Sequence, residues 1–248
     1  MALPGSRRRG YPRRMADSIR SPRPARNAGP RARDQGAPRL EPLLLEGLEP
    51  GLAGDPEAGH RTEGLAFDGA DFTGRELGAA TFSECAFRDV TAHDADLRSV
   101  SFLDCRFERL NAPSLPAPRS RWRGVEIEAS RIGSAELYDA ELNGVLVRGC
   151  KLGYVNLRGA RLRDVKFEDC AIEELDLGHA SAMRVAFEGT QIDALDARGA
   201  SFEHVDMRGA RLSRVSGIDG LRGATVSGLQ AAELAELMAA RLGIAVEG

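Results

Sequence analysis

The side chains best suited to metal binding or nucleophilic chemistry are four histidines and four cysteines in a chain of 248 residues. No HExxH, CxxC or GxSxG motif occurs, and no Gly-rich phosphate loop lies between a strand and a helix. Only His179 and His204 are expected to lie near each other, and two histidines without a third ligand do not make a zinc site. We therefore expect no catalytic, metal or cofactor site, and we interpret the protein as non-catalytic. The histidines are His60, His93, His179 and His204.

The cysteines are more informative because of their spacing. Cys85 and Cys105 lie twenty residues apart, as do Cys150 and Cys170. Four cysteines are too few for a disulfide scaffold, so we expect buried thiols in a cytoplasmic protein. A disulfide within each pair is the alternative, if the two members stack at close distance.

The same spacing belongs to a five-residue period that runs through the middle of the chain. Apolar residues occupy nearly every position whose number ends in 2 or 7, and small or apolar residues mostly occupy positions ending in 0 or 5. Neither an α-helix nor a flat strand produces this period. The frame holds without insertion over residues 63–216. Its clearest stretch reads Val147, Leu152, Leu157, Leu162, Phe167, Ile172 and Leu177.

This pattern resembles the pentapeptide-repeat family, whose unit is A-(D/N)-L-x-x. Close matches are Ala70-Asp71-Phe72, Ala95-Asp96-Leu97, Ala135-Glu136-Leu137 and Val155-Asn156-Leu157. The resemblance implies an all-β solenoid, a right-handed four-sided β-helix with four pentapeptides per coil. At twenty residues per coil the repeat region contains seven to eight coils. Central residues twenty apart should then stack, which places most of the aromatic residues in two columns.

The two ends of the chain leave the repeat. Residues 1–40 carry eleven Arg against Asp17 and Asp34, are rich in Pro, Gly and Ala, and are predicted to be a disordered arm. Such an arm could bind nucleic acid or an acidic membrane, but we favour a solvated tail. Residues 41–62, with a short leucine cluster, are interpreted as an N-terminal cap.

Residues 217–248 are predicted to contain a helix that closes the last coil. Ser227 and Gln230 have the spacing of a capping box, and Leu234, Leu237, Met238 and Leu242 form a helical stripe. The stripe could instead be a dimer surface, so the chain is expected to be a monomer or a homodimer through its C-terminal end. No stretch is long and apolar enough to span a membrane.

A Pro-rich break over residues 111–119 disturbs the pattern without shifting its frame. Pro113, Pro116 and Pro118 remove three backbone donors. We favour a degraded or looped-out part of one coil, tolerated at a corner or bulge, over a projecting recognition loop.

Outward charges are the remaining functional signal. On one wall of the expected β-helix, the positions just before the central apolar residues (numbers ending in 2 or 7) carry acidic side chains, which would form a column. A set of basic side chains lies on the adjacent wall. The resemblance to quinolone-resistance members of the family, which are taken to mimic DNA and bind type II topoisomerase, makes DNA gyrase a candidate partner. The alternative, which we favour, is that Asp or Asn at this position bonds the backbone at the corner. The acidic residues are Glu76, Asp96, Glu136, Asp176 and Asp196, and the basic ones Arg121, Arg123, Arg161 and Arg163.

We therefore predict a rigid module for protein–protein interaction, with DNA mimicry as the second hypothesis. The chain as a whole is slightly acidic, at 37 Asp and Glu against 34 Lys and Arg. On charge alone it does not have the composition of a nucleic-acid-binding protein.

Overall fold

The repeat region folds into a parallel β-solenoid. The structure is a computed structural model that describes residues 1–2 and 36–246, and the solenoid lies in the second of two compact units, Arg33–Gly248. Partner strands lie twenty residues apart, as in Val147↔Phe167 and Phe167↔Phe187. The prediction of an all-β solenoid with a twenty-residue coil is confirmed. The prediction of disorder over residues 1–40 falls outside the described residues except at 1–2 and 36–40.

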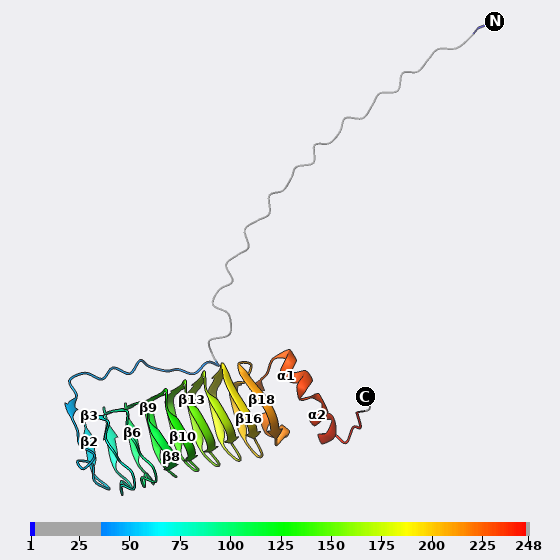
Figure 1. The fold of residues 1–248 in the computed structure, drawn as a ribbon. Coiled ribbons are helices and arrows are strands. Elements are labelled where there is room, and N and C mark those ends of the chain that lie inside the picture. The colour runs from blue at the N-terminus through cyan, green and yellow to red at the C-terminus, as the bar shows by residue number, and fades with distance from the viewer. Residues whose placement is uncertain (3–35, 247–248) are drawn as a thin grey trace. The chain divides into compact units, whose positions relative to one another are not determined.

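The strands form two sheets among the described residues (Figure 1). A thirteen-stranded sheet contains β1 (Glu49–Pro50), β2 (Arg61–Glu63), β3 (Leu65–Asp68), β4 (Thr81–Ser83), β5 (Ala86–Arg88), β6 (Ser101–Leu103), β7 (Arg106–Glu108), β9 (Arg121–Glu128), β11 (Glu141–Arg148), β13 (Arg161–Glu168), β15 (Ser181–Glu188), β17 (Ser201–Asp206) and β19 (Ala224–Thr225). A six-stranded sheet contains β8 (Asn111–Pro116), β10 (Arg131–Glu136), β12 (Lys151–Asn156), β14 (Ala171–Asp176), β16 (Thr190–Asp196) and β18 (Ala210–Ser216). The solenoid has about nine turns rather than the seven to eight predicted, because β1 and β19 add pairing at its two ends.

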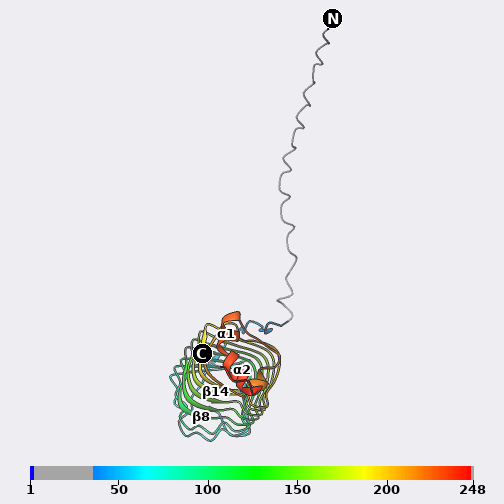
Figure 2. The same ribbon diagram turned by 90° about the vertical axis from the view of Figure 1, so that its right-hand side faces the viewer.

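The core is the set of inward columns that the period predicts. Phe67, Phe87 and Phe107 stack face to face in successive coils, at centroid distances of 5.1 and 4.5 Å. Phe82 and Phe102 form the second column beside them, 5.2 Å apart. Viewed along the solenoid axis, successive coils superpose around this core (Figure 2). The two aromatic columns are therefore confirmed.

Corners of the coil use left-handed backbone, even at residues with side chains. Asp104, Asp164 and Arg184 have φ between 53° and 55°, and Gly124 and Gly144 have φ of 63° and 67° in the same corner column. Asp is among the non-glycine residues that adopt this region at low cost. The change of backbone direction at the corner keeps the columns in register.

The Pro-rich segment 111–119 neither projects as a loop nor is looped out of its coil, so the predicted recognition loop and the looped-out segment are both wrong. Residues Asn111–Pro116 form β8, in register with β10. Pro113 and Pro116 have no N–H group to donate, and the six-stranded sheet has its edge at β8, which meets the preceding coil through the isolated bridge Thr91↔Asn111. The Pro116 carbonyl still accepts from Leu97 N at 3.0 Å.

The N-terminal residues divide between the side and the end of the solenoid. Residues 49–62 stack on the first coil, where Arg75 donates to the carbonyl of the buried Pro56 at 2.7 Å. Residues 36–48, which we call the strap, run along the side of the solenoid from the region of β17 back to β1 (blue in Figure 1). The leucine cluster of residues 43–48 thus lies along the side rather than over the open core.

The C-terminal segment contains a 3-10 helix, η1 (Ile218–Leu221), and two short helices, α1 (Gly228–Glu233) and α2 (Ala235–Arg241). The predicted capping box is confirmed, because Ser227 and Gln230 bond each other's backbone. The buried Gln230 side chain also donates to the carbonyls of Met207 and Ala210 at 2.7 Å, which ties α1 to the last coil.

Candidate interaction surfaces

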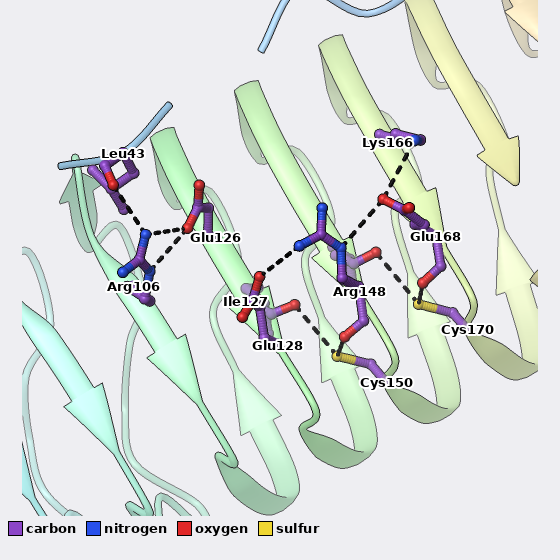
Figure 3. A network of polar contacts seen from close by, with 11 residues as sticks. Leu43, Arg106, Glu126, Ile127, Glu128, Arg148, Cys150, Lys166, Glu168 and Cys170 are labelled. Atoms are coloured by element: carbon purple, nitrogen blue, oxygen red, sulfur yellow. Dashed lines mark hydrogen bonds and ion pairs between the residues drawn. The ribbon is translucent and has the colours of Figure 1, made fainter. Parts of the chain in front are cut away.

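The wall containing β11 and β13 carries a ladder of ion pairs (Figure 3). Arg148 lies between Glu128 and Glu168 of the neighbouring coils, at 3.1 and 3.3 Å. Lys166 lies 3.3 Å from Glu168 and 2.7 Å from Glu188. Exposed pairs of this kind contribute little stability individually. Because acidic and basic side chains alternate along this wall, their charges largely cancel.

The aspartates of the predicted acidic column hold the corners of the coil. Each bonds the backbone N–H two residues later, so the prediction of a structural role at this position is confirmed for them. The bonds run from Arg98 N to Asp96 (3.0 Å), Gly178 N to Asp176 (2.8 Å) and Arg198 N to Asp196 (3.0 Å).

Two of these carboxylates are also paired with arginines on the same wall. Arg158 lies 3.1 Å from Asp176, which is 7% exposed, and Arg198 pairs with Asp196. The hydrogen bonds from Arg198 lower the pKa of Asp196. Their negative charge is therefore largely balanced within the wall.

The two glutamates of the column differ from the aspartates. Glu136 accepts a hydrogen bond from Asn156 at 2.7 Å, while Glu76 is exposed and adjoins Asp96 through an isolated bridge. The column is interrupted at Pro116 and Asn156, so it is not a continuous line of acids.

The predicted basic set is paired with acids on its own wall. Glu141 lies between Arg121 and Arg161, and the hydrogen bonds from these guanidinium groups, that of Arg161 foremost, lower its pKa. None of the acids paired with these four arginines belongs to the predicted acidic column. The nearest pairs are Arg121–Glu141 (3.3 Å), Arg161–Glu141 (2.7 Å), Arg123–Asp104 (3.9 Å) and Arg163–Asp164 (3.8 Å).

All four cysteines are free, buried thiols. Cys150 and Cys170 each donate to two backbone carbonyls, at 3.3 to 3.5 Å (Figure 3). Burial raises the pKa of Cys105, which disfavours the nucleophilic thiolate. The interpretation as buried thiols is confirmed. Among the described residues no group of three or more His, Cys, Asp or Glu side chains could hold a metal ion.

An exposed apolar surface lies at the C-terminal end, and sequence analysis predicted only part of it. Of the predicted stripe, Leu234 alone is buried against the solenoid. The helical period identified the residues of the stripe, but it does not show which of them pack against the solenoid. We call the remaining exposed side chains the C-terminal surface: Leu229 (72% exposed), Leu237 (42%), Met238 (41%), Leu242 (75%), Ile244 (57%) and Val246 (61%).

Beside this surface, the last strand of the six-stranded sheet has an unpaired edge. β18 pairs with β16 on one side and with no described strand on the other. A groove of about 390 Å³ separates it from α1 and α2, lined by Leu212, Val215, Leu234 and Leu237 among others. In the thirteen-stranded sheet, by contrast, β19 covers β17.

The five-residue period, the left-handed corners and the twenty-residue register together define a solenoid of pentapeptide repeats. The family model for pentapeptide repeats matches residues 67–108 and 135–177, in eight copies. Residues 67–108 and 135–177 are therefore pentapeptide repeats.

Two solved structures illustrate the range of similar proteins. Full-length QnrB1, a plasmid-mediated fluoroquinolone resistance protein, is 17% identical, with a TM-score of 0.28 over 74% of this chain and 100% of that one. HetL, a pentapeptide-repeat protein involved in heterocyst differentiation regulation in the cyanobacterium Nostoc, is 15% identical, with a TM-score of 0.22 over 70% and 92%. Similarity at these TM-scores supports no conclusion about partners. No curated protein matches the sequence.

No helix in the described part of the chain has the length and apolar character needed to cross a bilayer.

Proposed function

We propose that this protein is a non-catalytic interaction module that binds a protein partner through its C-terminal end. The observation that carries the proposal is the C-terminal surface, where six large apolar side chains are between 41% and 75% exposed. All six belong to one segment, residues 229–246, and a concentration of exposed large apolar side chains is typical of interaction sites.

The unpaired edge of β18 offers a second means of attachment at the same end. An extended segment of a partner could add to this edge through main-chain hydrogen bonds, while its side chains enter the groove beside Leu212 and Leu237. The partner could be another protein or a second copy of this chain.

Variants that add acidic side chains at exposed apolar positions test this proposal. Leu237→Glu with Met238→Glu places two acids on the C-terminal surface, outside the packed core. Tyr138→Glu, at a 37% exposed aromatic far along the chain, is the control. We expect pull-downs from the native host, and light scattering of the purified protein, to show an association that the double variant loses and the control keeps. Equal association by all three proteins would refute the proposal.

DNA mimicry directed at gyrase is the alternative, and the geometry favours it less. Asp176 and Asp196 bond their own corners and pair with Arg158 and Arg198, which reduces the field that the acidic column projects. Inhibition of gyrase supercoiling, abolished by Glu76→Lys with Glu136→Lys, would establish this function instead. Both glutamates lack the corner bond to the residue two positions later, so these substitutions spare the corner geometry.

A further inference from the structure

The strap occupies a channel along one corner of the solenoid. The backbone N–H of Arg39 donates to Asp164 at 2.9 Å, and Arg106 donates to the carbonyl of Leu43 at 2.9 Å. Gly36, at the start of the described strap, lies beside His204 of β17. Contacts between residues as far apart in the sequence as Gly36 and His204 thus place the thirteen residues of the strap along several coils.

The channel is shaped by one corner column of the repeat. This column reads Asp104, Gly124, Gly144 and Asp164 in successive coils. Gly144 has no side chain and leaves a depression in this column, whereas the Asp104 carboxylate lies over Gly124. A cleft of about 510 Å³ separates this column and Asn143 from strap residues Arg39 to Leu43.

The anchoring groups of the channel are held in place by other side chains of the solenoid. Asp164 is 6% exposed and receives two hydrogen bonds of 2.6 Å from the 8% exposed Arg184. Arg106 is held by Glu126 at 2.6 Å (Figure 3). Both groups bond the backbone of the strap rather than its side chains, so they would bind any extended chain of suitable shape.

The strap itself is weakly attached. Two hydrogen bonds join its described residues to the solenoid. Leu40, Leu43 and Leu45 are half-buried, whereas Leu44 between them is 80% exposed. Because an incoming segment would make the same kind of contacts that the strap gives up, exchange would cost little free energy.

We propose that this channel is a docking site for an extended, leucine-rich segment of a partner protein, and that residues 36–48 occupy it in cis and so regulate access. The site is separate from the C-terminal surface, and it stands independently of the function proposed above. A tethered strap competes at an effective concentration near the millimolar range, so a partner binds weakly until the strap is released.

The test uses the full chain and a fluorescent peptide with the sequence of residues 36–48. Arg39→Pro removes the N–H that bonds Asp164 and leaves the channel intact. Arg39→Ala keeps the N–H, and Ala37→Pro adds a proline at a residue whose N–H makes no described bond. Loss of one hydrogen bond to a carboxylate corresponds to about a tenfold change. We therefore expect Arg39→Pro to bind the peptide about tenfold more tightly than the wild type and both controls.

A variant of the channel completes the test. Asp104 and Asp164 show that this corner accepts side chains at positive φ, and a Cβ at Gly144 would lie 3.7 Å from its nearest neighbour. Gly144→Asn should thus fold, fill the depression and abolish peptide binding when combined with Arg39→Pro. On its own, Gly144→Asn should also remove the protection of the Arg39 amide from hydrogen exchange that we expect in the wild type.

Three results would overturn the proposal. The first is an Arg39 amide that exchanges freely in the wild type. The second is equal peptide affinity for Arg39→Pro and its controls. The third is a dimer of Arg39→Pro that the peptide dissociates, because the channel would then exchange straps between copies rather than bind another protein.

Discussion

Phe167→Ala is the most direct test of the solenoid core. Phe167 is 3% exposed, and its ring stacks on that of Phe187 at 5.1 Å with an interplanar angle of 6°. Burial of such a side chain contributes about 1.5–3 kcal/mol. The stacked pair contributes about 0.5–1.5 kcal/mol more, and the truncated side chain leaves a cavity. We therefore expect a loss of about 3–5 kcal/mol in the free energy of unfolding.

Urea unfolding followed by circular dichroism provides the measurement. The comparison is valid only if the slope against urea is unchanged, because repeat proteins can unfold in parts. Arg163→Ala is the outward control: its side chain is 61% exposed and 3.8 Å from Asp164, so its loss should be within about 0.5 kcal/mol. Phe167→Leu, which nearly keeps the volume, should lie between the two. Similar small losses for Phe167→Ala and Arg163→Ala would refute the inside–outside assignment.

Three further predictions concern polar groups. Gln230→Leu should lower the free energy of unfolding by about 2 kcal/mol, seen as a lower urea midpoint, because two carbonyls of the last coil lose their donor. Asp176→Ala should cost about 1 kcal/mol by the same assay, whereas Asp176→Asn, which can still bond Gly178 N, should cost less. Hydrogen bonds from Thr73 and Thr91 lower the pKa of Asp71 from 3.8 to about 2. A lowered pKa in the folded state means stability that is complete above about pH 4 and is lost as the pH falls toward 2. Thermal unfolding at pH 5 and pH 2.5 should show this decline, and Asp71→Asn should reduce it; an unchanged pH dependence would contradict the assignment.

The sequence by itself determined which side chains lie inside the solenoid. Because the backbone turns at a fixed interval and each coil has the same length, residues such as Phe167 and Phe187 must share a column. The aspartates of the corners were also predictable, since their bond to the residue two positions later is local. The capping box of Ser227 and Gln230 is equally local, and it forms as the spacing indicates.

Only the tertiary structure decided the contacts that join distant parts of the chain. The path of residues 36–48 depends on Asp164 and Arg106, which no local pattern connects to Arg39 or Leu43. The exposure of Leu237 depends on how far α2 lies from the last coil, and a helical period is the same for a buried and an exposed stripe. Repetition makes the local environment of each coil predictable, whereas a segment outside the repeat can pack against any of several similar coils.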